Sequence, residues 1–273
     1  MENLTHLRAV VTGATSGLGE AMADALLEAG ARVAFASRPT VRLDEAVARR
    51  CDRGLAAFAV PMDVRDPISV QAGAQKAEAL LGGVDLVVNN AGIGMRTVNP
   101  RFLEEPMAFF EVPPDRFTDV VATNLTGYFL VARAFAPRFV EQRRGRFVNI
   151  SMNHETMRRR GFVPYGPARA GAEALSLIMA EDLRADGVAV NILLPGGATA
   201  TGMVPDSLPG GTRRNLLQPD VMKAPILFLA SHEAEGLTGE RIVAKDFERW
   251  LADFRSRATA GAPLQSPEGP ERT

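Results

Sequence analysis

The sequence predicts an α/β fold, in which a doubly wound parallel sheet of about seven strands carries helices on both faces as a three-layer sandwich. Two observations predict it. Short runs of β-branched and apolar residues alternate with helical stretches along most of the chain. These runs also lack polar alternation, which is typical of strands buried on both faces. Repeated strand–helix–strand units imply parallel strands, because the intervening helix returns the chain to the same edge.

The elements follow in order along the chain. Strands are predicted at residues 7–12, 32–37, 56–63, 84–90, 145–151, 188–194 and 241–244. Helices are predicted at 17–29, 40–51, 67–81, within 115–142, and at 165–184. The first helix carries its apolar residues on one face and is closed by Gly30, as expected of a helix end.

Two long connections and the C-terminus depart from this alternation. Residues 93–117 are rich in proline and aromatic residues, and residues 195–219 are rich in glycine and proline. Loops of this length in a compact domain usually serve a site, so we expect both to flank one. Residues 258–273 contain almost no core-forming side chains and are predicted to be a disordered tail. Residues 1–257 are predicted to form one domain.

Composition excludes several classes of function. The chain has 273 residues, 46% of them hydrophobic, and a formal net charge of −1. This charge favours neither nucleic acid nor an acidic membrane surface as a partner. No apolar run approaches the roughly 20 residues of a membrane helix, and the N-terminus lacks a basic-then-apolar leader. One cysteine, Cys51, rules out an internal disulfide and fits a reducing compartment. We therefore expect a cytoplasmic protein that acts on a small molecule.

A glycine-rich turn separates the first strand from the first helix. Gly13, Gly17 and Gly19 stand within "TGATSGLG" (residues 12–19). Glycine permits a tight turn and a close approach of the backbone to a pyrophosphate, which the N-terminus of the following helix attracts. A glycine-rich turn also occurs without a ligand, but its place in the first strand–helix–strand unit favours a nucleotide.

The end of the second strand indicates which nucleotide is bound. Ser37 and Arg38 stand where an acidic residue would accept a hydrogen bond from the ribose of NAD, and Arg42 is near. A hydroxyl and a cation suit a 2′-phosphate, so NADP(H) is preferred over NAD(H). Arg38 is otherwise a solvated residue at a helix start. Asp63 follows the third strand, where it would accept from adenine or cap the next helix.

Further motifs follow at characteristic distances. They are "DV" (63–64), "NNAG" (89–92), Asn124, Ser151, Tyr165 and "PG" (195–196). With the glycine-rich turn, this set resembles the short-chain dehydrogenase/reductase family, classical type, over roughly residues 5–245. The resemblance implies a Rossmann-type fold and an NADP(H)-dependent oxidoreductase that interconverts a carbonyl and an alcohol on a small or medium, partly apolar substrate.

The resemblance also implies a role for each matching residue. Asn124 bends its helix and helps to hold a water chain, and Ser151 hydrogen-bonds the substrate carbonyl. Tyr165 is the general acid in reduction and the general base in oxidation. The residues that the resemblance and the turn chemistry place at the cofactor are Gly13, Thr15, Ser16, Gly17, Leu18, Gly19, Ser37, Arg38, Asp63, Val64, Asn90, Ala91, Gly92, Tyr165, Arg169, Pro195, Gly196, Thr199 and Thr201. The family's usual threonine position after "PG" is occupied by Ala200.

Arg169 stands where the family has a lysine that binds the ribose, lowers the pKa of the tyrosine and passes protons to water. It lies one helical turn after Tyr165. Arginine supplies positive charge and several donors but releases a proton poorly. Three interpretations remain. Arg169 serves an active reductase in which water or a ribose hydroxyl relays the proton; the redox chemistry is lost or changed; or Arg169 points outward and another cation serves, with Arg158–Arg160 as candidates.

The substrate is expected between residues 93–117, 152–163 and 197–217. Apolar side chains there either line a pocket or pack the loops against the body; they are Phe102, Met107, Phe109, Phe110, Phe162 and Met203. Arg96, Arg101 and His154 are candidates to orient a polar or acidic group, and His154 is also a candidate for proton transfer. A loop histidine is more often only exposed or hydrogen-bonded. No cluster of His, Cys, Asp or Glu has metal-ligand spacing, so no metal is predicted.

The helices within 115–142 and at 165–184 carry apolar residues around much of their circumference. Because the resemblance implies subunit pairing through this surface, we expect a homodimer or homotetramer. A competing class is a regulatory protein that binds NADPH without turnover, and Arg169 is the residue that distinguishes the two.

Overall fold

The computed structural model describes residues 3–205 and 210–259 and contains one sheet of seven parallel strands. They are β1 (Arg8–Thr12), β2 (Arg32–Ser37), β3 (Ala57–Pro61), β4 (Leu86–Asn89), β5 (Gly145–Ile150), β6 (Val188–Leu194) and β7 (Arg241–Val243). Their order is β3-β2-β1-β4-β5-β6-β7. Every neighbouring pair is parallel. The predicted Rossmann-type sheet is confirmed.

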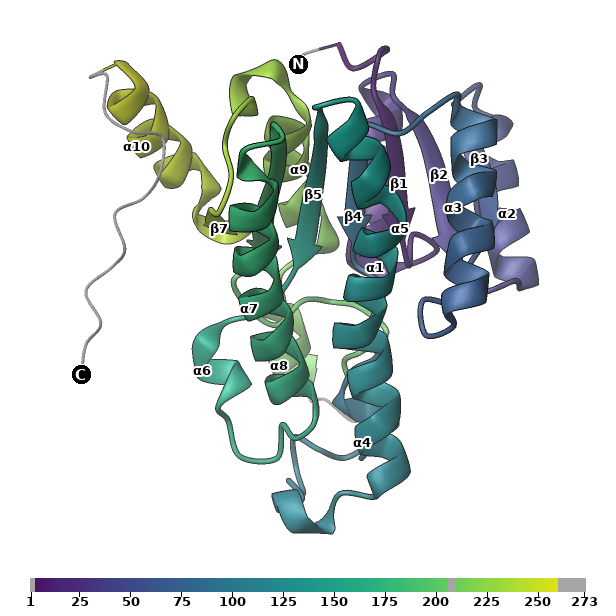
Figure 1. Ribbon diagram of the computed structural model, residues 1–273. Helices are drawn as coiled ribbons and strands as arrows, with labels where there is room; N and C mark the ends of the chain where they lie inside the picture. The colour runs from purple at the N-terminus through teal and green to yellow at the C-terminus, as the bar shows by residue number, and fades with distance from the viewer. Residues whose placement is uncertain (1–2, 206–209, 260–273) are drawn as a thin grey trace.

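Helices cover both faces of this sheet (Figure 1). On one face lie α1 (Gly17–Glu28), α2 (Val41–Cys51) and α9 (Lys223–Ala230). On the other lie α3 (Pro67–Leu81), α5 (Gly127–Glu141) and α7 (Tyr165–Arg184). Since each strand is covered on both sides, apolar residues can occupy every position of a strand, which explains the absence of polar alternation.

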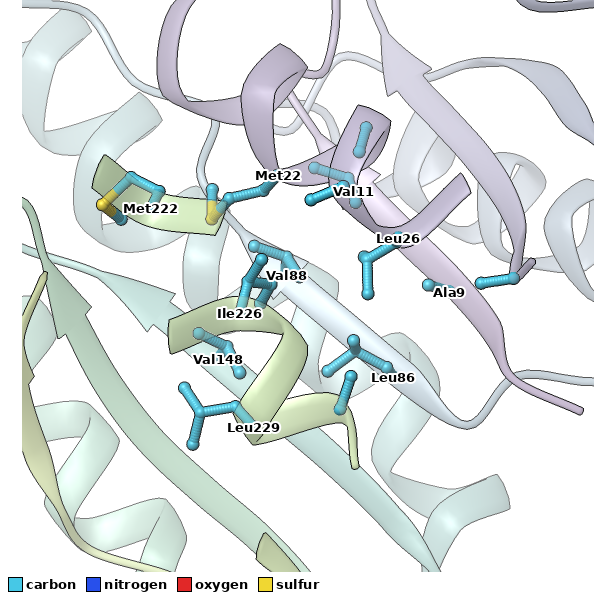
Figure 2. Packing of buried hydrophobic residues seen from close by; sticks show 14 of the residues in the cluster. Ala9, Val11, Met22, Leu26, Leu86, Val88, Val148, Met222, Ile226 and Leu229 are labelled. Carbon is cyan, nitrogen blue, oxygen red and sulfur yellow. The ribbon is translucent and has the colours of Figure 1, made fainter. Parts of the chain in front are cut away.

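Successive residues of a strand enter opposite halves of the core. In β1, Ala9 and Val11 belong to the cluster under α1 and α9, whereas Val10 belongs to the cluster under α3 and α5. Figure 2 shows the first cluster, in which Met22 and Leu26 of α1 and Ile226 of α9 lie over the central strands. Burial of these apolar groups is the main force that holds the helices on the sheet.

The strand order reverses between β1 and β4, and this reversal places the site. In a doubly wound sheet, ligands bind at the carboxyl ends of the strands where the order reverses. Figure 1 shows the strand arrows pointing toward the end of the molecule that carries α4 (Pro114–Val121), α6 (His154–Met157) and α8 (Gly210–Arg214). The long connections predicted to flank a site therefore lie at that end.

Several strand and helix ends differ from the sequence prediction by one or two residues, and two helical regions also differ. The helical region within 115–142 is interrupted, since a π-helical segment, Ala122–Thr126, joins α4 to α5. The last helix, α10 (Phe247–Thr259), extends two residues into the predicted tail, and the remainder of that tail lies outside the described residues. In α10, Trp250 and Phe254 pack with Phe228 of α9. No helix in the described part of the chain is long and apolar enough to span a membrane.

Candidate active site

The glycine-rich turn is shaped by close contacts that only glycine permits. Gly13 has φ +65°, and a Cβ there would lie 2.9 Å from the Cα of Ala91. A Cβ at Gly19 would lie 2.3 Å from Nδ2 of Asn90. The hydroxyl of Ser16, which precedes α1, makes no capping hydrogen bond to that helix. The first N–H groups of this twelve-residue helix therefore remain for an anion, as a phosphate site requires.

The segment after "PG" meets this turn. A Cβ at Gly17 would lie 3.1 Å from Cγ2 of Thr201, so the two residues face each other. Thr199 turns inward instead, and its hydroxyl donates to the carbonyl of Gly197 at 3.1 Å. A cavity of about 670 Å³ beside the turn is lined by both Gly17 and Thr201. Of the two threonines predicted at the cofactor, Thr201 is the one placed at the phosphate turn.

Three residues predicted at the adenine end gather at the ends of β2 and β3. Arg38 is exposed directly after Ser37, the last residue of β2. Hydrogen bonds from Arg65 hold the pKa of Asp63 below its ordinary value, and the charge of Arg38 adds to this effect. Asp63 does not cap α3, which was one of its two expected roles, because the side chain of Asp66 accepts the N–H of Ile68 instead.

The "NNAG" segment is fastened to the end of β1. The hydroxyl of Thr12 accepts the N–H groups of Asn90 and Ala91, at 2.9 and 3.0 Å. The amide of Asn90 donates back to the carbonyl of Thr12 at 2.9 Å. These three hydrogen bonds therefore hold the end of β1 and the residues after β4 together. Val64, the other residue predicted at this part of the cofactor, is buried against Gly127.

Asn124 lies in the π-helical segment and is fully buried. Its side chain accepts the N–H of Ile93 at 2.9 Å and donates to the carbonyl of Ile93 at 2.8 Å. Both ends of its amide are thus engaged by the chain that follows "NNAG". A π-helical turn often marks a functional position because it re-aims a side chain out of the regular helix. Here it places Asn124 against the loop beside the candidate site.

Ser151 follows β5 and is buried, with its N–H still bonded to the carbonyl of Leu193 in β6. Its hydroxyl has no hydrogen-bond partner among the described residues. Buried hydroxyls are nearly always satisfied, so an unpaired one at the carboxyl end of a strand suits a ligand oxygen. The sheet therefore offers a preformed donor where the sequence predicted a contact with substrate.

Tyr165 and Arg169 occupy the first turn and a half of α7. Tyr165 is half-buried and contacts the apolar cluster of Met95, Phe102 and Phe162. Arg169 is 2% exposed, and its guanidinium carbon lies 5.3 Å from the ring centroids of Tyr128 and Tyr165 alike. The interpretation in which Arg169 points outward is wrong, because the side chain turns into the sheet end beside Tyr165.

Arg169 is held there by two acceptors. One amino group, Nη1, donates to the hydroxyl of Tyr128 at 2.5 Å and to the carbonyl of Ile150 at 2.7 Å. No carboxylate is among the groups that act on its charge, and Nε is buried without a hydrogen-bond partner among the described residues. Burial opposes the charge, but attraction to Tyr128 and Tyr165 outweighs it and raises the pKa of Arg169 above its ordinary value. Arg169 is therefore a permanent buried cation.

Tyr128 is a residue of this site that the sequence analysis missed. It is the second residue of α5, lies one helical turn after Asn124 and is 2% exposed. Two signals could have found it: its spacing from Asn124, and the fact that the chain contains only two tyrosines. The apolar residues around it made it indistinguishable from an ordinary core aromatic.

The two long connections meet above this site. Met203 packs over Gly94, where a Cβ would lie 3.2 Å from its Cγ. The guanidinium of Arg96 reaches the carbonyls of Gly202 and Val204, both at 3.4 Å. Arg96 and Met203 thus join residues 93–117 to the segment after β6. The carbonyl of Gly196 in that segment accepts from Asn153 at 3.1 Å, and that of Pro195 accepts from Lys245 at 3.1 Å.

Phe162 is buried, as expected if the loop aromatics pack against the body, but two other aromatics are exposed. Phe162 and Phe102 are buried against each other with ring centroids 5.5 Å apart. Phe109 and Phe110 are 73% and 76% exposed and contact each other, so their predicted place in a pocket lining is wrong. They stand in a short turn, Phe109–Glu111, that has no buried residue.

The polar candidates also have partners of their own. His154 lies 2.9 Å from a carboxylate oxygen of Glu173, which also accepts from Arg241. Arg101 forms a surface ion pair with Glu105. Arg101 is therefore engaged away from the site, whereas His154 stands on α6, three residues after Ser151.

Gly92 lies directly against the buried cation, and a substitution there tests the arrangement. A Cβ at Gly92 would lie 2.5 Å from Nη2 of Arg169, a side-chain atom, so Gly92→Ala is expected to displace the guanidinium while the fold persists. We expect turnover to fall about 10²-fold with little change in melting temperature. Gly202→Ala is the matched control, because a Cβ there meets nothing within 4 Å. Equal activity of the two variants would contradict this geometry.

Comparison with known proteins gives a consistent result. A family model described as short chain dehydrogenase matches residues 8–209. A 3-oxoacyl-acyl-carrier-protein reductase of Vibrio cholerae is 30% identical over 250 residues, which cover 88% of this chain and 96% of that protein. A gluconate 5-dehydrogenase of Gluconobacter oxydans is 31% identical over 71% of this chain and 72% of that protein.

Solved structures agree with this result. A gluconate 5-dehydrogenase from Burkholderia cenocepacia, in complex with NADP and tartrate, has a TM-score of 0.78 and 26% identity to this chain. The likeness covers 89% of this chain and 95% of that one. The chain therefore belongs to the short-chain dehydrogenase family, and it is an NAD(P)-dependent oxidoreductase that interconverts carbonyl and alcohol groups.

Proposed function

We propose that this protein is an NADP(H)-dependent reductase of small or medium, partly apolar carbonyl compounds, with Tyr165 as its general acid and base. The observation that carries the proposal is the inward position of Arg169, which brings a permanent positive charge to the ring of Tyr165. In this proposal Arg169 takes the place that the resemblance gives to a lysine. Ser151 and the apolar cluster of Met95, Phe102 and Phe162 form the substrate side.

Ser151, Tyr165 and Arg169 have different roles in proton transfer. In reduction, the hydroxyls of Ser151 and Tyr165 donate to the substrate carbonyl oxygen, and Tyr165 gives up its proton as negative charge develops there. Arg169 stabilises the phenolate that remains, because a cation beside a phenol favours its charged form. Since a guanidinium releases a proton poorly, the proton that restores Tyr165 comes from another donor, such as water. Arg169 thus contributes charge and position.

The chain also fits the cofactor. Gly13, Gly17 and Gly19, the free N–H groups of α1 and Thr201 would hold the pyrophosphate, and Arg38 a 2′-phosphate. When bound, the nicotinamide supplies or accepts the hydride. Support for NADP(H) comes from the exposed cation after β2 and from the absence of an acidic residue at Ser37 and Arg38.

Reversal of charge at Arg38 tests this preference. An aspartate there would repel a 2′-phosphate and accept from a ribose hydroxyl, so Arg38→Asp is expected to raise the KM for NADPH roughly tenfold or more and to lower that for NADH. Arg53→Asp is the matched control, since Arg53 follows the far end of α2 and pairs with Glu28 on the surface. Initial rates with both nucleotides measure the effect. An unchanged ratio of the two KM values would show that Arg38 does not bind the 2′-phosphate of NADPH.

A panel of carbonyl compounds tests the activity itself. Purified protein with NADPH or NADH is mixed with ketones, aldehydes, quinones and enones, and loss of the reduced nicotinamide is followed by absorbance. 3-Oxoacyl compounds are included, and gluconate is assayed separately with NADP⁺ by the gain of reduced nicotinamide, because similar proteins are named for these substrates. We expect faster turnover with NADPH, and with ketones that carry an apolar substituent. Turnover restricted to NADH, or to fully polar substrates, would contradict the proposal.

We also propose that two or more copies associate through α4, α5 and α7. Four large apolar side chains on these helices are between 43% and 59% exposed: Phe117, Phe129, Leu177 and Ile178. Apolar surface gathered on neighbouring helices commonly marks a subunit interface. The molecular mass in solution, measured by light scattering, distinguishes a dimer or tetramer from a 29.3 kDa chain.

A further inference from the structure

Tyr128 joins three elements of the site through one hydroxyl. Its oxygen lies 2.5 Å from Nη1 of Arg169 on α7 and 3.1 Å from the carbonyl of Ile150 at the end of β5. Nη1 itself lies 2.7 Å from the same carbonyl. The phenol donates to Ile150 and accepts from Arg169, so each hydrogen on Nη1 has an acceptor. The three groups form a closed set of contacts at the base of the site.

The protonation of Tyr128 suits this role. Burial raises the pKa of Tyr128 above its ordinary value, and the charge of Arg169 opposes that rise only in part. The phenol therefore remains neutral near pH 7, keeps its proton for Ile150 and offers a lone pair to the guanidinium. Its hydroxyl is shielded from solvent by complete burial. Tyr128 is thus suited to hold Arg169 and unsuited to exchange protons with substrate.

A guanidinium is planar, so two fixed contacts at one amino group orient the whole group. With Nη1 held by Tyr128 and Ile150, Nη2 lies against Gly92 and the guanidinium carbon lies 5.3 Å from the ring of Tyr165. Without the phenol oxygen, Nη1 would keep one acceptor and Nε would still have none among the described residues. A buried cation with too few acceptors would turn toward any other oxygen in reach.

We propose that Tyr128 is the positioning residue of Arg169. Its hydroxyl fixes the guanidinium beside Tyr165 and so allows arginine to support turnover in place of a lysine. The proposal rests on the proposed function, because it presumes turnover through Tyr165. A lysine at position 169 carries a single compact ammonium group on a flexible stem and has no plane to orient. The hydroxyl of Tyr128 therefore matters for turnover with arginine and far less with lysine.

A double-mutant cycle tests this dependence. Tyr128→Phe, Arg169→Lys and the double variant are compared with wild type for kcat and for the KM of NADPH. We expect Tyr128→Phe to lower kcat about tenfold in the arginine background and less than about twofold in the lysine background, since coupled residues are not additive. Thr123→Val is the matched control: it removes a buried hydroxyl from the same helical region, where its partner is the carbonyl of Asp119. That variant is expected to leave kcat unchanged in both backgrounds.

The two tyrosines of the chain provide a readout that needs no turnover. Tyrosine isotope-labelled at Cζ gives two NMR signals, one for each side of Arg169. In Tyr128→Phe the remaining signal belongs to Tyr165, and we expect it to move from its wild-type position at the same pH because the guanidinium shifts. Thr123→Val is expected to leave both signals in place.

The outcomes separate this proposal from the proposed function. An unmoved Tyr165 signal in Tyr128→Phe, or an equal loss of kcat in the arginine and lysine backgrounds, would overturn the positioning role while turnover stands. If the Tyr165 signal moves in Tyr128→Phe but the wild-type protein turns over no carbonyl compound, the proposed function is overturned. The claim that Tyr128 serves turnover is then overturned with it. A shifted signal together with a loss confined to the arginine background supports both.

Discussion

Tyr165→Phe is expected to abolish reduction of every carbonyl substrate, with kcat falling roughly 10²- to 10⁴-fold. The change removes the hydroxyl of the ring that lies beside both the Arg169 charge and the apolar cluster of Met95, Phe102 and Phe162. The ring remains to pack against that cluster, so the fold should be unaffected. Initial rates and the affinity for NADPH, measured by fluorescence, report turnover and binding separately.

The expected pattern is a loss of turnover with NADPH binding retained. Phe162→Leu serves as the control, because it changes the same apolar cluster without removing a hydroxyl. It is expected to alter KM more than kcat. If Tyr165→Phe turned over substrate at the wild-type rate, another group would have to donate the proton.

Arg169→Met is expected to lower kcat about 10²-fold while leaving the melting temperature equal to or above that of wild type. The guanidinium is buried beside two phenols and a carbonyl, with no carboxylate partner among the described residues. Replacing such a buried charge with an apolar side chain of similar length is often neutral or stabilising, and Tyr128 keeps the carbonyl of Ile150 as its partner.

A second buried arginine provides the contrast. Arg50 is 5% exposed and donates to carboxylates of Glu20 and Asp24 at 2.7 and 2.8 Å. Arg50→Met leaves those carboxylates without their partner and should lower the melting temperature with little effect on kcat. Calorimetry and initial rates should therefore separate the two variants: Arg169→Met loses kcat but not melting temperature, and Arg50→Met loses melting temperature with little effect on kcat. A clear fall in the melting temperature of Arg169→Met would show that Arg169 stabilises the fold.

Regular elements could be predicted from the sequence because their signals are local. The helix at 67–81 was predicted with correct bounds, since Pro67 opens it and Gly82 closes it with a left-handed backbone. The helix at 165–184 was also placed correctly. The parallel sheet followed from apolar strands alternating with helices, and the phosphate turn followed from glycines that the structure shows in close contact.

The contacts that decide the chemistry could not be predicted because they join distant segments. Arg169 and Tyr128 are 41 residues apart, and only packing of α5 beside α7 brings them together. A local contact also differed, since Asp66 caps the helix for which Asp63 was one candidate and Arg65 engages the carboxylate of Asp63. Phe109 and Phe110 were expected in a pocket because they are apolar, and the turn that carries them has no buried face. Residue type alone does not specify orientation on a loop.

The comparison of wild type with Arg169→Lys tests the central claim most directly, namely that the buried guanidinium supports turnover through Tyr165. Both proteins are assayed for NADPH consumption with the best substrate of the carbonyl panel. The account predicts turnover by wild type and a slower lysine variant, because lysine gives up the paired contacts to Tyr128 and Ile150. Tight binding of NADPH by a silent wild type, together with turnover by Arg169→Lys, would contradict it and show that arginine has switched the redox reaction off.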